Sequence, residues 1–491
     1  MTTLLPGLLA LLLVPVLAPA ANPAPAPVPV PVPVQDPDPP QVRSLSDISQ
    51  EFTFYMDGRF HRQYLAANGG RDVRNWGSLG KADLEPFNLL LLTGGNPRIP
   101  YRDDARRNVL DFARRGGTVL LMADGADPDL PAHALAEDFG LVLSDRAAAG
   151  PLRGVGELEG ASIEFRRGNV LELPRNGIDP PWTPLVVDRD GRPVLAAREL
   201  GGPGGGALVV GSRGLFGRRP DASDPINAAW VTPMLESRAT RKACTGPLPR
   251  RLPAEHRRQV GPLTVEYHDG TARFVEDIHQ VYTEVRPHLV ELTGCEPSPG
   301  MITSLLILPT GGGGFSSGRR IAIGAWWGNY PERRYPMIEL IAHEAGHSWV
   351  LPHPEPMWNE PIATYLGIRV GRRMGMPEAE ETLQRQLAKA RRHDPDLDAV
   401  DPQSDGAHRD LVWGKSYFVF EELERRHGPG ALARYFAAKR ALVDADRPDY
   451  TMDDCVAVWS RGTGTDLFPW FRSLAFDVDA DRTDLWPAPS G

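Results

Sequence analysis

Residues 343–347, with the sequence HEAGH, constrain this chain more than any other part of it. Residues four apart in an α-helix lie on the same face, so the side chains of His343 and His347 can bind one metal ion. Glu344 lies at the edge of that face, where its carboxylate can take a proton from a metal-bound water. If residues 337–350 form a helix, the motif predicts a zinc-dependent hydrolase of peptide bonds. A chance match between two surface histidines is the alternative.

Residues 337–350 have the composition of a buried helix. Pro336 suits the first turn, because proline lacks an amide hydrogen that this turn leaves unpaired anyway. Apolar residues surround the motif at positions 337, 338, 340, 341, 342 and 345. Two histidines and a glutamate in such a helix need polar partners, and a metal ion would supply one. The surrounding sequence therefore favours a metal site over a chance match.

Two residues are candidates for a third ligand, since a catalytic zinc usually takes three protein ligands and leaves one position for water. His353 gives the histidine spacing of the metzincin pattern H-E-x-x-H-x-x-G-x-x-H. Val350 stands where that pattern has glycine, and no Met-turn follows. Glu360 precedes Pro361, which suits a helix start, so its side chain would project from the beginning of a second helix. The residues alone leave both candidates open.

Residues 357–365, MWNEPIATY, resemble the W-x-N-E-G-F-A-x-Y segment of gluzincins related to aminopeptidase N. In that family the glutamate is the third zinc ligand. The resemblance therefore implies that His343, His347 and Glu360 hold one catalytic zinc ion and that Glu344 is the general base. The sequence departs from the family in having proline after the ligand glutamate and a shorter spacer before it.

Residues 412–428, VWGKSYFVFEELERRHG, resemble the gluzincin segment in which a tyrosine stabilises the tetrahedral oxyanion. Aligned on Lys415, that position is Trp413, whose indole donates a hydrogen bond but lacks the chemistry of a phenol. Tyr417 lies one helical turn later on the same face and is the candidate substitute, with packing in the core as the alternative. The likeness covers about residues 260–480.

The segment before the metal helix predicts a flexible glycine-rich loop at residues 310–318 and a strand at residues 320–326. In gluzincins an edge strand at this place pairs with the substrate backbone. The resemblance implies that role for residues 320–327, with Gly324 allowing close approach of the peptide. An ordinary edge strand with aromatic packing is the alternative. The G-x-M-x-N motif of the aminopeptidases is not evident, so the choice between endo- and exopeptidase stays open.

The first half of the chain alternates strand and helix patterns. The predicted elements are strands at 52–56, 88–93, 118–122 and 207–211 and an amphipathic helix at 101–115. Three of these strands are continuous apolar runs, as in a buried parallel sheet, and the alternation predicts a doubly wound α/β fold. Glycine-rich turns at 94–96 and 211–214 either bind a ligand or simply make tight turns. The arrangement resembles the class I glutamine amidotransferase-like fold. The nucleophilic cysteine of that family is missing, since no cysteine precedes Cys244.

Composition and pattern divide the chain into six segments. The expected plan is a signal peptide at 1–20, a proline-rich linker at 21–42, a non-catalytic α/β domain at 43–218, a linker at 219–259, an α+β zincin domain with a mostly helical second half at 260–481, and a tail at 482–491. Residues 4–20 are apolar and end in an A-x-A pattern, which predicts export to the medium, periplasm or cell envelope. An uncleaved membrane anchor is the alternative.

The net charge and the cysteine count limit the binding partners and disulfide bonds that this chain can have. A net charge of −9 without a basic run argues against nucleic acid. An odd cysteine count excludes complete pairing, and Cys244 with Cys295 is either a disulfide or a pair of free thiols. We therefore expect a peptide, protein or glycoprotein substrate and no stable membrane insertion. Two alternatives are a catalytically inactive zincin-fold binding protein at the cell surface and a mucin-degrading peptidase similar to the enhancins, which pair similar domains.

Overall fold

A computed structural model describes residues 41–486 with interior gaps. The gaps are residues 51–70, 76, 166, 175–178, 202–204, 217–226, 245, 251, 352, 405, 445 and 448. The predicted signal peptide, nearly all of the predicted proline-rich linker and the predicted strand at 52–56 lie outside the described residues. Among the described helices, none is long and apolar enough to cross a membrane.

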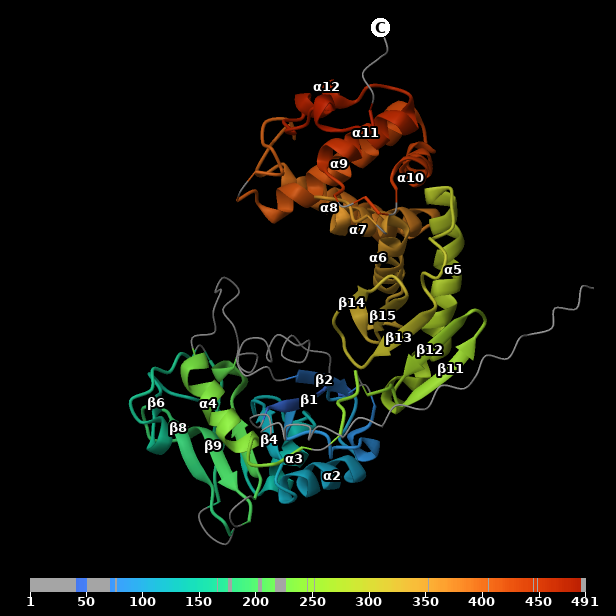
Figure 1. The fold of residues 1–491 in the computed structure, drawn as a ribbon. Helices are drawn as coiled ribbons and strands as arrows, with labels where there is room; N and C mark the ends of the chain where they lie inside the picture. Colours follow the sequence, from blue (N-terminus) through green and yellow to red (C-terminus); the bar gives the residue numbers. More distant parts are fainter. Residues whose placement is uncertain are drawn as a thin grey trace, which may run out of the picture. The chain divides into compact units, whose positions relative to one another are not determined.

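A mixed sheet forms the first half of the described chain (Figure 1). Its strands are β1 (Arg43–Asp47), β2 (Arg71–Asn75), β3 (Leu89–Thr93), β4 (Thr118–Met122), β6 (Arg153–Gly154), β8 (Thr183–Val187), β9 (Pro193–Glu199) and β10 (Ala207–Gly211). Their order is β2-β1-β3-β4-β10-β9-β8-β6, parallel from β2 to β10 and antiparallel beyond it. Every residue of β3, β4 and β10 is buried, which explains their continuous apolar sequences. The predictions for these three strands are confirmed, whereas the antiparallel extension was not expected.

Helices and a small ribbon accompany this sheet. They are α2 (Asp103–Arg114), α3 (Ala132–Phe139), α4 (Ala228–Ala239), and the pair β5 (Val142–Ala147) and β7 (Asn169–Glu172). The predicted linker at residues 219–259 contains a regular helix, α4. Trp230, Val231 and Leu235 of α4 are buried in the same apolar cluster as Val209 of β10. Pro233 lies inside this helix, and because proline is unfavourable in a helix interior, the local sequence does not predict α4. The position of the domain boundary stays a prediction.

A second sheet precedes the metal-motif helix. Its strands are β11 (His256–Val260), β12 (Leu263–Tyr267), β13 (Ser304–Leu308), β14 (Gly314–Ser316) and β15 (Arg320–Gly324), in the order β11-β12-β13-β15-β14. Side chains of a strand alternate between the two faces of its sheet. In β13, Leu305 and Ile307 join the largest apolar cluster, whereas Leu306 and Leu308 join the cluster that also contains β3 and β10 residues. Burial on both faces accounts for the unbroken apolar run of this strand.

The edge of the second sheet differs from expectation. The glycine-rich segment 310–318 contains β14, which pairs antiparallel with β15 and lies at the edge. The prediction that residues 320–327 form the edge strand is therefore wrong, because β15 lies between β13 and β14. The Gly324 amide donates to the Gly313 carbonyl at 2.9 Å. The backbone that lies close to Gly324 is therefore the turn before β14. A short glycine-rich strand has too few side chains to produce an alternating pattern.

Helices dominate the second half of the chain (Figure 1). They are α5 (Val275–Thr293), α6 (Tyr335–Val350), α7 (Asn359–Arg373), α8 (Pro377–Ala390), α9 (Arg409–His427), α10 (Ala431–Leu442), α11 (Met452–Thr463) and α12 (Phe468–Ser473). Short 3₁₀ turns are η3 (Leu79–Lys81), η4 (Gly156–Leu158), η5 (Arg213–Leu215), η6 (Asp269–Phe274), η7 (Trp327–Asn329) and η8 (Ala480–Arg482). An α/β region followed by a helical half is consistent with the predicted multidomain fold class. All three cysteines are free thiols.

Candidate metal centre

The HEAGH motif lies on α6, and its two histidines face each other. The Nε2 atoms of His343 and His347 are 3.2 Å apart, and the two rings are nearly perpendicular. Gly346, on the same helix, is where α7 approaches α6. A Cβ atom there would lie 3.1 Å from the Leu366 side chain and 3.6 Å from the Cα atom of Ala363, so a larger residue would crowd α7. The missing side chain thus lets α7 pack closely beside the histidines.

Glu360 enters the same site from the first turn of α7. Its carboxylate oxygens are 3.3 Å from Nε2 of His343 and 3.5 Å from Nε2 of His347. Zinc binds such atoms at about 2.0–2.1 Å, and a tetrahedral arrangement then spaces the ligand atoms about 3.3 Å apart. The two imidazoles and the carboxylate therefore fit a zinc ion in both donor chemistry and spacing.

His353, the rival third ligand, lies elsewhere. Its Nε2 is 2.7 Å from the backbone carbonyl oxygen of Asp444, and its ring packs beside Tyr450. The carbonyl of His353 accepts a hydrogen bond from Lys439 at 2.7 Å, which holds this part of the chain against α10. The structure thus brings Glu360, and not His353, to the histidine pair.

Thr364 orients His343 from behind. Its Oγ1 is 2.8 Å from Nδ1 of His343, so that ring nitrogen can donate to the hydroxyl while Nε2 keeps a lone pair for a metal. Thr364 follows Glu360 by one helical turn, and α7 therefore carries both residues on one face. Sequence reasoning missed Thr364, although the four-residue spacing from Glu360 was the signal that pointed to it.

Glu344 lies beside the histidines in a protected position. It is 5% exposed, and its carboxylate lies within 4.8 Å of the ligand nitrogens of both histidines. Burial raises the pKa of Glu344 to about 7, and the charge of Glu360 acts in the same direction. Burial also lowers the pKa of His347 to about 4, so its imidazole is neutral at neutral pH, as ligation requires. Hydrogen bonding to His343 lowers the pKa of Glu360.

Strand β14 covers Glu344, and a glycine makes this possible. A Cβ atom on Gly314 would lie 3.1 Å from Oε1 of Glu344 and 2.3 Å from the carbonyl oxygen of Ala322. No side chain fits there without moving the strand. The Gly313 carbonyl and the Ser317 amide bond to the β15 side. Because antiparallel strands alternate, the main-chain polar groups of Gly314 and Ser316 point to the open edge.

A cleft of about 530 Å³ joins these parts. It is lined by residues 314–318 around β14, by His343, Glu344, His347, Leu351 and Pro354, and by Asn359 and Glu360 at the start of α7. This volume is in the range of ligand-binding clefts. Its open side is the unpaired edge of β14, so an extended chain can lie along the strand and pass the histidine pair.

Tyr417 does not reach the cleft. It is fully buried in α9, its ring packs against Tyr365 and Trp413, and its hydroxyl has no hydrogen-bond partner among the described residues. Burial raises the pKa of this hydroxyl above its usual value. The geometry therefore gives no support to the predicted catalytic role of Tyr417, which fills the core behind the metal helix.

Arg409, at the start of α9, was not foreseen. Its guanidinium lies 5.1 Å from the centre of the Trp413 ring, and its charge contributes to lowering the pKa of Glu360. It is an exposed cation on the side of the site where the resemblance placed a tyrosine. A single arginine before a tryptophan has no distinctive sequence pattern, so only the structure connects it with Glu360.

No protein-family model and no curated protein matches this chain. Among solved structures, an M1 zinc metallopeptidase from Deinococcus radiodurans is similar over 48% of this chain and 53% of its own, at 13% identity and a TM-score of 0.33. Legionella pneumophila aminopeptidase A is similar over 43% of this chain and 26% of its own, at 16% identity and a TM-score of 0.31. The mmIFT52 N-terminal domain is similar over 39% of this chain and 97% of its own, at 15% identity and a TM-score of 0.29.

The structural neighbours thus include zinc metallopeptidases, and the chain spans about half the length of the Deinococcus protein. At TM-scores near 0.3 such likeness says nothing about chemistry. Only the geometry of the candidate metal centre therefore bears on the chemistry of this chain.

Proposed function

We propose that this chain is a secreted zinc metallopeptidase with a gluzincin site. The observation that carries the proposal is the convergence of three donor groups, two imidazoles and a carboxylate whose atoms lie 3.2 to 3.5 Å apart, next to the buried carboxylate of Glu344. His343, His347 and Glu360 would hold the ion, and Thr364 would fix the ring of His343. Zinc at this place supplies a Lewis acid that polarises the scissile carbonyl and acidifies water.

Other residues of the chain would transfer protons and bind the substrate during hydrolysis. Glu344 takes a proton from the attacking water, whose oxygen bonds to the acyl carbon, and gives a proton to the amine as the C–N bond breaks. The open edge at Gly314 and Ser316 binds the peptide backbone by strand addition. The predicted zincin domain at residues 260–481 carries all these groups, and the predicted α/β domain at residues 43–218 adds no catalytic residue.

Replacement of the general base tests this function. We expect Glu344→Gln to retain one zinc per chain and to lose hydrolysis by about 10³-fold or more, because the amide is similar in shape but accepts no proton. Metal analysis of the purified protein and cleavage of a mixed peptide library measure the two properties. Full hydrolysis by this variant would refute the mechanism.

A second function is favoured by one observation, the absence of a tyrosine hydroxyl among the residues that line the cleft. The alternative is a zincin-fold binding protein at the cell surface that holds zinc without cutting its partner. A cleavage screen with peptides, folded proteins and mucin-type glycoproteins separates the two. One zinc per chain without cleavage of any substrate would favour the binding protein, whereas cleavage of mucins alone would favour the enhancin-like activity.

A further inference from the structure

A second cavity, of about 290 Å³, lies away from the metal centre at the carboxyl ends of β1 and β3. Gln50 lines it and follows β1 closely, whereas Arg98, Ile99 and Pro100 line it and follow β3. His268, which precedes η6, closes another side. We call this space the sheet-end cavity. It is several times larger than the roughly 30 Å³ that one water occupies, so it has room for an organic molecule.

The topology of the first sheet marks this place. Strand β1 lies between β2 and β3, and all three run parallel. The chain therefore leaves β1 toward β2 on one side and returns to β3 on the other side. Open α/β sheets bind ligands outside the carboxyl ends of their strands at such a switch point. The sheet-end cavity lies at the β1–β3 switch point.

Two buried polar side chains on its walls have no partner among the described residues. Both ring nitrogens of His268 and the side-chain oxygen of Gln50 lack hydrogen bonds. His268 is 3% exposed and Gln50 is 9% exposed, so bulk water does not satisfy them. Buried polar groups are rarely left unpaired in folded proteins. Two such groups around one cavity indicate that something polar belongs inside it.

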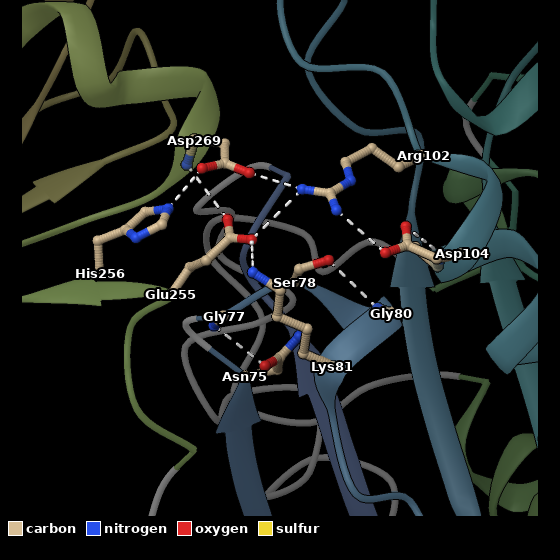
Figure 2. A network of polar contacts seen from close by, with 11 residues as sticks. Asn75, Gly77, Ser78, Gly80, Lys81, Arg102, Asp104, Glu255, His256 and Asp269 are labelled. Carbon is tan, nitrogen blue, oxygen red and sulfur yellow. Dashed lines mark hydrogen bonds and ion pairs between the residues drawn. The ribbon is translucent and has the colours of Figure 1, made fainter.

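The carboxylates beside the cavity already have partners, as Figure 2 shows. Arg102 lies 2.6 Å from Asp269 and 3.5 Å from Glu255. Lys81 contacts Glu255 at 3.2 Å, and His256 bonds to Asp269. Glu255 and Asp269 thus already have basic partners within the protein.

Arg98 is different. Its guanidinium lies 5.2 Å from the centre of the Trp326 ring, and it has no carboxylate partner in the part of the chain that the structure describes. Arg98 is thus a cation on the cavity wall with no described carboxylate beside it, and it favours an anion. Ile99, Pro100 and Ala105 add apolar surface. The cavity thus combines one cation, two unpaired hydrogen-bonding groups and an apolar wall.

We propose that the sheet-end cavity binds a small organic carboxylate of the size of an N-acylated amino acid. The carboxylate pairs with Arg98, an N–H group donates to the oxygen of Gln50, and a second polar group meets the neutral ring of His268. The apolar side chain packs against Ile99 and Pro100. This site does not depend on the peptidase activity, because it uses no residue of the metal centre.

Titration of the full-length, zinc-loaded protein with N-acetyl-L-leucine tests the proposal by ligand-observed NMR. We expect one saturable site with a dissociation constant of about 1 mM or lower. N-acetyl-L-leucinamide, which has the same shape without the charge, should bind about tenfold more weakly. Absence of saturation by about 10 mM would overturn the proposal.

Three variants locate the binding. Arg98→Ala should weaken N-acetyl-L-leucine binding about tenfold, and Arg107→Ala, an exposed arginine on α2 that does not line the cavity, should leave it unchanged. Gln50→Leu should weaken binding and raise the melting temperature, because it removes the unpaired oxygen. Unchanged binding in Arg98→Ala would show that N-acetyl-L-leucine binds outside the sheet-end cavity, and this result would refute the proposal. Glu344→Gln should bind like the parent protein, which separates this result from the test of hydrolysis.

Discussion

At the scale of single residues, Thr364 shows how the metal centre depends on a side chain that would not touch the metal. Its hydroxyl lies 2.8 Å from Nδ1 of His343 and selects the tautomer that leaves Nε2 free. Partners of this kind typically change metal affinity 10- to 100-fold, because they hold the ring in place and raise its basicity.

We therefore expect Thr364→Val to lower zinc affinity about 10- to 100-fold with little change in the fold. Competition with a chelating dye at neutral pH measures the affinity. Thr283→Val is the matched control, since Thr283 is exposed on α5 and bonds only to the His279 carbonyl. Equal zinc affinity in the parent and Thr364→Val would show that the hydroxyl does not orient the ligand.

At the scale of elements, β14 determines how the cleft is covered. The strand lies over Glu344 only because residue 314 has no side chain, as the 2.3 Å distance to the Ala322 carbonyl shows. A short strand of three residues thus places open main-chain groups beside Glu344. Its position depends on backbone pairing with β15 and on the packing of Phe315 against an apolar cluster.

Gly314→Ala should push β14 away from β15 and lower kcat/KM about tenfold or more, while zinc content stays at one per chain. Gly312→Ala is the control, because a Cβ atom there would meet its nearest neighbour, Oγ1 of Thr310, at an ordinary 3.7 Å. Peptide hydrolysis and metal analysis of both variants check the prediction. Equal loss of activity in the two variants would mean that general loop strain, and not contact over Glu344, is responsible.

A second element-scale feature holds the chain between α6 and α7. Lys439 of α10 is nearly buried and pairs with Glu355 at 2.5 Å. It also donates to the carbonyls of Val350 and His353, at 3.3 and 2.7 Å. These contacts fix the path by which the chain leaves α6, and they keep the imidazole of His353 at Asp444.

Lys439→Met should lower the free energy of unfolding by about 3–5 kcal/mol, because it leaves the buried carboxylate of Glu355 without its cation. Urea denaturation measures this change. Arg425→Met is the comparison, since its exposed ion pair with Glu422 contributes little to stability. Similar losses in the two variants would contradict the structural role of Lys439.

At the scale of the whole molecule, the candidate metal centre lies between two helices of the largest apolar core. His343 and His347 lie on α6 and Glu360 lies on α7, so an ion held by all three would stabilise the packing of these helices against each other. A ligand present at about 1,000 times its dissociation constant stabilises the native state by about 4 kcal/mol. Zinc should therefore contribute to folding as well as to chemistry.

Removal of zinc with 1,10-phenanthroline should lower the melting temperature by several degrees, and added zinc should restore it. Differential scanning calorimetry measures the shift. Glu360→Ala should show a smaller shift than the parent, because it keeps only two protein ligands. An identical melting temperature with and without the chelator would argue against a structural contribution from the ion.

Some of this architecture was predictable because its signals are local. The apolar runs of β3, β4, β10 and β13 reflect burial on both faces of a sheet. Each run is only five residues long, so a short stretch of sequence is enough to indicate this burial. The helix α6 was equally clear from its proline and its apolar surroundings. In contrast, β14 is rich in glycine and α4 contains a proline, so neither has the periodic pattern that predicts its conformation.

The amino-acid sequence is enough to place His343 and His347 on one helical face, because residues four apart in a helix lie on the same side. It leaves both His353 and Glu360 as candidates for a third ligand. The folded chain brings Glu360 to the histidine pair, since contacts of Lys439 with a segment more than 80 residues away direct that part of the chain. Tertiary packing also places Tyr417 in the core and brings Gln50 and His268 together around one cavity. Residues that are far apart in sequence come together through packing, and a local hydrophobic pattern does not predict which of them will meet.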